Sequence, residues 1–350
     1  MHYYVYQHPI ELESGASLPE LQIAYHTFGQ LNAQADNVVW VSHALTANSD
    51  VFDWWPGLFG PTDFFNPEEY FIVCPNILGS HYGTTGPLSI HPETSQPYLH
   101  AFPQFTVRDM VQVHQILADH LGIRQIQVLI GASLGGQQAL EWSIQQPEQI
   151  KNLILLATNA QHSPWGIAFN ESQRMAIELD PSWGTGELSD GMEGMKVARS
   201  IALLSYRHYQ TYQQAQEESD RDKTDGYRAA SYQVYQGEKL QRRFNAYSYY
   251  YLSKAMDSHH VGRGRGSVEL ALKQIQARSL VVGIDSDILF PPTEQKRLAE
   301  GIPDAQYVEL NSQFGHDGFL LEAAALSGIF NDFFNTQTQL TKKVSLVSEH

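Results

Sequence analysis

Residues 129–142 read LIGASLGGQQALEW, and the pattern changes at a single serine. The apolar residues before Ser133 predict a buried strand, and the residues after it predict an amphipathic helix. A turn of this kind can hold the serine hydroxyl above the edge of a sheet, where a substrate can reach it. The stretch therefore indicates a reactive serine at the end of a core strand.

The turn matches G-x-S-x-G, the nucleophile elbow that carries the reactive serine in α/β-hydrolases. Gly131 and Gly135 are small enough for the strand and the helix to approach each other closely, as this turn requires. The backbone N–H of Leu134 starts the helix, so we expect it to form one half of an oxyanion hole. The alternative is that Ser133 only caps the helix.

Other apolar runs predict the sheet that this elbow needs. Strand-like stretches alternate with helical ones such as VRDMVQVHQILADHLG, which is typical of a parallel sheet covered on both faces. We predict an α/β-hydrolase fold with a mostly parallel, eight-stranded sheet and an inserted helical lid. The runs read NVVWVSHAL (37–45), YFIVCPNIL (70–78), IQVLIGAS (126–133), IKNLILLAT (150–158), RSLVVGIDSD (278–287) and AQYVELNSQ (305–313), and ELESGASLPELQIAYHTFG (11–29) predicts two antiparallel strands with SGAS as the turn.

The predicted strands stop for more than a hundred residues in the middle of the chain, where the sequence is helical in character and rich in tyrosine and glutamine. We call this stretch, residues 161–274, the lid segment. The predicted core consists of residues 1–160 and 275–340, and residues 341–350 form a polar tail.

The chain also offers partners for the serine in the order serine, acid, histidine that this fold uses. Asp287 ends one late strand and stands four residues before Pro291, a spacing that favours it over Asp285 as the acid. His316 follows the next strand, which indicates the general base. The loop after an early strand should supply the second oxyanion donor, the backbone N–H of Leu45.

Composition limits the possible partners. The formal net charge of −16 argues against general binding to nucleic acid or to an anionic membrane. Neither a secretory signal nor a run of about 20 apolar residues is present, and the single cysteine, Cys74, cannot form an intramolecular disulfide. We predict a cytoplasmic enzyme without membrane or nucleic-acid partners.

Several blocks together closely resemble the homoserine O-acetyltransferase family. They are HALTANSDVFDWWPGLFGP (43–61), NILGSHYGTTGPLSI (76–90), FPQFTVRDMV (102–111), GASLGGQQALEW (131–142), FNESQRMAI (169–177), DSHHVGRGRG (257–266), SDILFPP (286–292) and FGHDGFLLE (314–322). The resemblance implies that Ser133 takes an acetyl group from acetyl-CoA and passes it to L-homoserine, a ping-pong reaction of methionine biosynthesis. It also implies a homodimer formed through the lid.

The same resemblance implies residues that bind the amino-acid acceptor. They are Arg199 for its carboxylate, Tyr206 on the same helix face, Asp317 for its ammonium group and Thr46 as a neighbour. The family more often has glycine where Ala47 stands, and a larger residue there could narrow the acyl pocket. The sequence therefore leaves an acetyl or succinyl donor open, and homoserine or serine as the acceptor.

Alternative functions remain open at this point. A serine esterase would use the same three residues, and a silent binding module could share the fold. Arg263 and Arg265 in GRGRG could contact the phosphates of CoA or pair with acids of the chain. No metal-ligand spacing or dinucleotide motif is present, so we expect no metal and no permanently bound cofactor.

Overall fold

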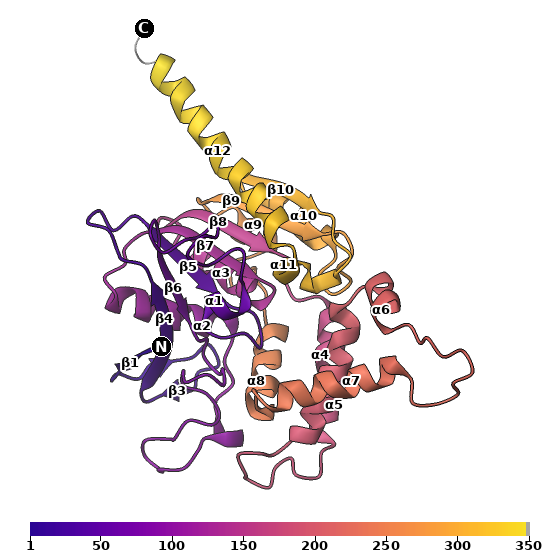
Figure 1. The fold of residues 1–350 in the computed structure, drawn as a ribbon. Helices are drawn as coiled ribbons and strands as arrows, with labels where there is room; N and C mark the ends of the chain where they lie inside the picture. Colours follow the sequence, from indigo (N-terminus) through magenta and orange to yellow (C-terminus); the bar gives the residue numbers. More distant parts are fainter. Residues whose placement is uncertain (348–350) are drawn as a thin grey trace.

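A computed structural model describes residues 1–347 of the chain, with side chains through residue 336. Within this range one sheet of eight strands forms the centre of the molecule (Figure 1). β4 pairs antiparallel with β1 and with β6, and the remaining pairs are parallel, which confirms the predicted fold class. Across the sheet the order is β1 (His2–Tyr6), β4 (Leu21–Phe28), β6 (Phe71–Pro75), β5 (Val38–Ser42), β7 (Ile126–Ala132), β8 (Ile150–Leu156), β9 (Arg278–Ile284) and β10 (Ala305–Leu310).

The central strands read as continuous apolar runs because both faces of the sheet are covered. Along β5, Val38 and Trp40 pack into one core cluster, and Val39 and Val41 pack into the other. The first cluster lies under α2 (Val107–His120), α3 (Leu134–Gln145) and α10 (Pro292–Gly301), and the second under α1 (Val51–Trp54), α11 (Gly318–Leu321) and α12 (Ala323–Val347).

The elbow joins β7 to α3 at the centre of the sheet. Ser133 has a φ of 55° and a ψ of −125°, a conformation that a residue with a side chain rarely adopts. A Cβ atom on Gly135 would lie 2.0 Å from the carbonyl oxygen of Ser42, so the start of α3 packs directly on the end of β5. Because Gly135 has no side chain, the end of β5, the end of β7 and the start of α3 can meet beside Ser133.

The lid segment leaves the sheet after β8 and returns before β9. These two strands are neighbours, with Asn152 of β8 paired with Arg278 of β9. Figure 1 shows α4, α5, α7 and α8 gathered beside the sheet instead of in its two layers. The boundaries 161–274 of the lid segment remain our proposal. Its helices are α4 (Pro164–Glu178), α5 (Met192–Tyr206), α6 (Tyr209–Gln216), α7 (Arg228–Gln241), α8 (Ala246–Asp257) and α9 (Val268–Leu272).

The two ends of the chain hold elements that the sequence did not predict. β1 is an edge strand with mostly exposed side chains, so it lacks the apolar pattern of a core strand. The predicted turn at SGAS does join two short antiparallel strands, β2 (Ile10–Glu11) and β3 (Ser17–Leu18). Helix α12 extends to Val347, into the predicted polar tail 341–350, and the last three residues of that tail lie outside the described residues.

Replacing Gly135 by alanine should destabilise the protein, because the new methyl group meets a backbone carbonyl that cannot rotate away. We expect the free energy of unfolding to fall by about 1–3 kcal/mol, the usual cost of overpacking. Gly328→Ala is the matched control. That glycine lies in α12 with open space around its Cβ position, so alanine should stabilise the helix by up to about 1 kcal/mol. Urea unfolding monitored by tryptophan fluorescence measures both, and equal effects would contradict the packing argument.

Candidate active site

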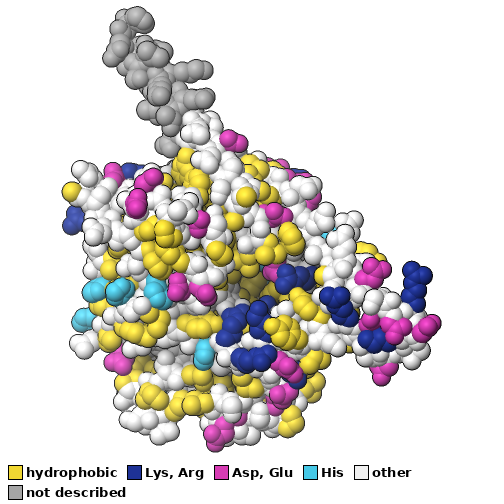
Figure 2. All heavy atoms as spheres, viewed as in Figure 1, with side chains coloured by type: hydrophobic (Ala, Val, Ile, Leu, Met, Phe, Trp, Pro, Cys, Tyr) yellow, Lys and Arg dark blue, Asp and Glu magenta, His cyan; other side chains and the backbone are white. Residues whose placement is uncertain are grey.

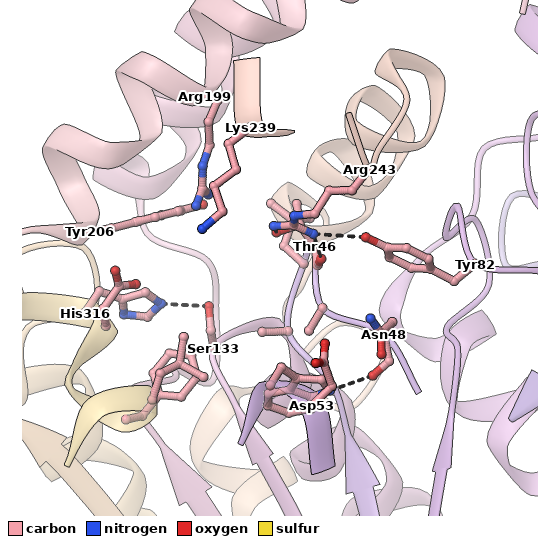
Figure 3. A pocket seen from close by; sticks show the side chains of 17 residues that line it. Thr46, Asn48, Asp53, Tyr82, Ser133, Arg199, Tyr206, Lys239, Arg243 and His316 are labelled. Atoms are coloured by element: carbon pink, nitrogen blue, oxygen red, sulfur yellow. Dashed lines mark hydrogen bonds between the residues drawn. The ribbon is translucent and has the colours of Figure 1, made fainter. Parts of the chain in front are cut away.

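Three residues from distant parts of the chain form a hydrogen-bonded series at the carboxyl edge of the sheet. The Nε2 atom of His316 lies 2.9 Å from the hydroxyl oxygen of Ser133 (Figure 3). Its Nδ1 atom lies 2.6 Å from Oδ2 of Asp287. The three residues are 4%, 6% and 3% exposed in the order His316, Ser133, Asp287, so bulk water has little access to them. This geometry allows the imidazole to take a proton from the serine while the carboxylate orients the ring.

The two candidate acids have different surroundings. Asp287 Oδ1 accepts hydrogen bonds from the backbone N–H groups of Leu289 and Phe290, which leaves Oδ2 directed at the histidine. Asp285 instead accepts from the backbone of Ser312 and the side chain of Asn311, and so ties the end of β9 to the loop after β10. The structure thus places Asp287, and not Asp285, beside His316.

His316 differs electrostatically from the other buried histidines. Burial alone lowers its pKa, but the charge and hydrogen bond of Asp287, with a smaller contribution from Asp317, raise the pKa above the ordinary value. For His43 and His114 burial lowers the pKa to about 4, and for His162 and His259 it lowers the pKa to about 3. Of these five buried histidines, His316 is therefore the one whose pKa favours proton exchange near neutral pH.

The loop after β5, residues 43–48, borders the serine from the other side. Leu45 lines the same cavity as Ser133, and Leu134, the first residue of α3, has a backbone N–H without an acceptor in its own helix. His43 is fully buried, and its ring is held between the carbonyl of Ala44 and the backbone N–H of Ile77. That pairing agrees with a structural histidine.

A cavity of about 380 Å³ opens above the serine. Its floor consists of the loop after β5, α1 and the segment around His316, and its roof comes from the lid segment. Figure 3 shows Arg199 and Lys239 entering the cavity from the lid helices, opposite Ser133 and Asp53. A volume of this size suits a small polar substrate with an acyl group.

Three of the four predicted acceptor-binding residues meet at one wall of this cavity. The guanidinium carbon of Arg199 lies 5.4 Å from the centre of the Tyr206 ring, and both residues are on α5. Burial raises the pKa of Tyr206, so its hydroxyl stays protonated and can donate a hydrogen bond. Asp317 also lines the cavity, but Arg207 already pairs with its carboxylate at 2.6 Å. Its charge is thus partly compensated before any ligand binds.

The fourth predicted residue, Thr46, is hydrogen-bonded to Arg243 of the lid segment. The sequence analysis did not identify Arg243 as a site residue. Nη1 of Arg243 donates to the Thr46 carbonyl oxygen at 2.5 Å and to the Tyr82 hydroxyl at 3.0 Å, and Nη2 donates to the Thr46 hydroxyl at 3.3 Å (Figure 3). The neighbouring Phe244 is buried against the ring of Tyr82. One guanidinium therefore joins the lid segment to the loop that carries Leu45.

Sequence reasoning missed the other charged residues of the cavity and offered two arginines that lie elsewhere. Arg263 pairs with Glu13 and Arg265 pairs with Glu141, so the structure supports the pairing alternative and gives no support for contact with phosphates. Among the described residues, no group of three or more histidine, cysteine, aspartate or glutamate side chains is arranged to hold a metal ion.

The cavity-lining residues that the sequence analysis missed include Asn48, Asp53, Tyr82, Lys239 and Arg243. Lys239 and Arg243 stand four residues apart at the end of a helical pattern, which was the available signal.

The fold and the serine site together define an α/β-hydrolase. A family model described as the alpha/beta hydrolase fold matches residues 37–323. Among solved structures, a homoserine O-acetyltransferase from Bacillus anthracis superposes with a TM-score of 0.88 at 24% identity, over 95% of this chain and 97% of that one. Esterase E22 superposes with a TM-score of 0.86 at 22% identity, over 95% and 99%. At such identities these likenesses show the fold alone.

Similarity in sequence identifies the family more specifically than similarity in fold. A homoserine O-acetyltransferase from Cyclobacterium marinum is 48% identical, over 94% of this chain and 93% of that relative. A second, from Trichormus variabilis, is 45% identical over 95% of this chain and 93% of the relative. The chain belongs to the homoserine O-acetyltransferase family.

The raised pKa of His316 predicts how the rate depends on pH. The base must be neutral, so kcat/KM for an acyl substrate should fall with decreasing pH around an inflection above 6.5, the ordinary histidine value. Asp287→Asn removes the two largest contributions that raise the pKa, so burial should then move the inflection below 6.5. The rate itself should drop by about 10⁴-fold, as for other triads. Profiles of both proteins on p-nitrophenyl acetate test this, and an unmoved inflection would refute the assignment of the base.

Arg243→Lys should weaken catalysis without unfolding the protein. Lysine keeps the positive charge but cannot donate to Thr46 and Tyr82 in the same fork geometry. Loss of charge-assisted hydrogen bonds worth about 1.5–3 kcal/mol should lower kcat/KM by about 10- to 100-fold, for small and large acyl donors alike. The control is Arg242→Lys, an exposed neighbour that lies outside the cavity. Equal activity of the two variants would exclude a role for the contact.

Proposed function

We propose that this protein transfers an acetyl group from acetyl-CoA to the hydroxyl of L-homoserine, through an acyl-serine intermediate, as a step of methionine biosynthesis. The observation that carries the proposal is the hydrogen-bonded series Ser133, His316, Asp287 at the floor of a cavity roofed by charged lid residues. The names of relatives that are 45–48% identical support the substrate and the acyl group. In this reaction acetyl-CoA is a co-substrate, and no permanently bound cofactor takes part.

In the first half-reaction the Ser133 hydroxyl oxygen attacks the thioester carbonyl carbon, and Nε2 of His316 takes the hydroxyl proton. The carbonyl oxygen becomes an oxyanion, which the backbone N–H groups of Leu45 and Leu134 stabilise. When the tetrahedral intermediate collapses, the carbon–sulfur bond breaks and His316 returns the proton to the thiolate. The products are free CoA and acetyl-Ser133.

The second half-reaction repeats these steps with a different nucleophile. His316 accepts the proton of the homoserine hydroxyl while its oxygen attacks the acetyl carbon, and the same oxyanion donors act again. Collapse then breaks the bond to the serine oxygen, which receives the proton from His316. O-acetylhomoserine leaves, and the free serine is restored.

The charges of the acceptor match the lid side of the cavity. We assign its carboxylate to Arg199, because a planar guanidinium can donate two parallel hydrogen bonds to it. The Tyr206 hydroxyl and Thr46 neighbour that position, and Asp317 receives the ammonium group. An ester hydrolase needs none of these charged groups, so their presence in one cavity favours transfer to an amino acid.

Water is the competing acceptor, and the structure limits its access. Ser133 and His316 are more than nine-tenths buried, and the His316 ring stacks on Phe290 at 5.1 Å. A bound acceptor then has a high effective concentration beside the acyl-enzyme. The likeness to an esterase structure shows that the same fold is also found in hydrolases, so the preference for transfer needs its own test.

We also propose that the enzyme is a cytoplasmic homodimer that associates through the lid segment. Large apolar side chains are exposed on three lid helices, among them Leu179 at the end of α4, Leu204 on α5 and Tyr235 on α7, with exposed fractions of 81%, 57% and 50%. Contact with a second copy would cover such a surface. Cys74 is fully buried, which agrees with a thiol that stays reduced.

The proposal predicts thiol release that depends on the acceptor. With acetyl-CoA and L-homoserine together, the wild-type protein should release CoA continuously, and Ser133→Ala should release none above the uncatalysed rate. Without homoserine, release should stop after about one equivalent per active site, since the acyl-enzyme waits for its acceptor. A chromogenic thiol assay follows all three reactions.

Other outcomes would contradict parts of the proposal. Continuous release without homoserine would identify a hydrolase, and release by Ser133→Ala would exclude this serine as the nucleophile. Succinyl-CoA and L-serine should be tested in the same assay. A higher kcat/KM with either of them would overturn the assigned donor or acceptor.

A further inference from the structure

The peptide bond between Ser133 and Leu134 contains one of the two proposed oxyanion donors, the N–H of Leu134. The carbonyl of this peptide belongs to Ser133 and points the opposite way, because the N–H and C=O groups of a trans peptide are antiparallel. An interaction that fixes the Ser133 carbonyl therefore also fixes the direction of the Leu134 N–H. Ser133 has a φ of 55° and a ψ of −125°, a rare conformation that needs support from its surroundings.

Two hydrogen bonds hold the Ser133 carbonyl oxygen. The backbone N–H of Gln137 donates to it at 3.1 Å, as in any first turn of a helix, and the hydroxyl of Thr158 donates to it at 2.8 Å. Thr158 is 25 residues further along the chain, just after β8. The threonine thus adds a hydrogen bond that α3 cannot supply by itself.

Thr158 is itself held firmly from the core. Its backbone carbonyl accepts a hydrogen bond at 2.6 Å from Nε2 of Gln295, a fully buried residue of α10, and the preceding Ala157 donates its N–H to a carbonyl of β9 at 3.0 Å. A Cβ atom on Gly136 would lie 2.6 Å from the Thr158 side chain, so the threonine packs directly on the first turn of α3. Its hydroxyl therefore has little room to move away from Ser133.

Thr158 can affect catalysis only through the protein. Figure 2 shows lysine and arginine side chains around a hollow on this face of the molecule, whereas Thr158 has no exposed surface and is not among the residues that line the cavity above Ser133. It therefore touches no substrate held in that cavity. Its hydroxyl can instead fix the plane of the peptide and polarise it, because hydrogen bonds joined in series strengthen one another.

We infer that Thr158 is a positioning residue for the oxyanion hole, whose hydroxyl holds the Ser133 carbonyl so that the Leu134 N–H is directed at the carbonyl oxygen of the substrate. The inference rests on the part of the proposed function that makes Ser133 the nucleophile and Leu134 an oxyanion donor. It does not depend on which acyl donor or acceptor is used. A donor directed in this way stabilises the transition state more than the bound substrate, since the negative charge develops only there.

Thr158→Val removes the hydroxyl and keeps the shape of the side chain. We expect kcat to fall about tenfold, as for one lost buried hydrogen bond, and by less than the roughly 10²- to 10³-fold that removal of an oxyanion donor itself costs. The loss should be equal for hydrolysis of p-nitrophenyl acetate and for transfer to L-homoserine, because the same donor serves both half-reactions. The KM for L-homoserine should not change. Thr158→Ser keeps the hydroxyl and should retain most of the wild-type rate.

A transition-state analogue separates the direction of the N–H group from general damage to the protein. Methylboronic acid forms a tetrahedral adduct with an active-site serine, and one of its oxygens takes the place of the oxyanion. In Thr158→Val its inhibition constant should rise by about the factor by which kcat/KM falls. The inflection of the pH profile should stay where it is in the wild type, because the contact between His316 and Asp287 is untouched.

Ser143→Ala is the matched control. It also removes a buried hydroxyl, one that donates to the Ala139 carbonyl at 2.9 Å towards the far end of α3, so kcat and the inhibition constant should both stay at the wild-type values. All rates are expressed per folded protein, measured by urea unfolding. If Thr158→Val does not fold, Thr158→Ala and Thr158→Ser provide the same comparison.

Three results would overturn the inference. They are an unchanged kcat in Thr158→Val, an equal loss in Thr158→Ser, and a loss of the same size in Ser143→Ala. Failure of the proposed function looks different. A wild type that cleaves p-nitrophenyl acetate but transfers nothing to L-homoserine would contradict the proposed acceptor, and the ester assay would still decide the role of Thr158.

Discussion

The close approach of α3 to the end of β5 is the constraint on which the site depends. Gly135 lies so near the Ser42 carbonyl that no side chain fits between them. This contact accompanies the positive φ of Ser133 and brings the loop after β5 to the same point. His316 then approaches from the loop after β10, with its ring fixed by Asp287. The proposed nucleophile, its proposed base and both proposed oxyanion donors thus depend on one tightly packed junction.

The lid segment adds charge to a site whose core side is largely apolar. Its cations enter from α5, from α7 and from the turn before α8, and one of them, Arg243, is also bonded to the loop next to the serine. A movement of the lid would therefore change both the shape of the cavity and the position of Thr46. This coupling gives the lid segment two tasks in our account, to exclude water and to recognise charged substrates.

The sequence predicted the parts of the structure that depend on local pattern and chain order. Apolar runs predicted the core strands. The turn after β7 and the loops after β9 and β10 pointed to Ser133, Asp287 and His316, because the carboxyl ends of parallel strands meet at one edge. β1 was missed because its side chains are mostly exposed. Arg243 was missed because its partner, Thr46, is 197 residues away, and only packing of the lid segment on the core brings them together. The surroundings of Arg263 and Arg265 depended in the same way on glutamates far away in the sequence.

The central claim is that Ser133 carries the acetyl group between two substrates. Intact-protein mass spectrometry tests it most directly, after the protein is mixed with acetyl-CoA alone and quenched in acid. The account predicts a mass increase of one acetyl group, located on the peptide that contains Ser133 and removed when L-homoserine is added before the quench. An unmodified protein, or an acetyl group located on another residue and insensitive to homoserine, would contradict it.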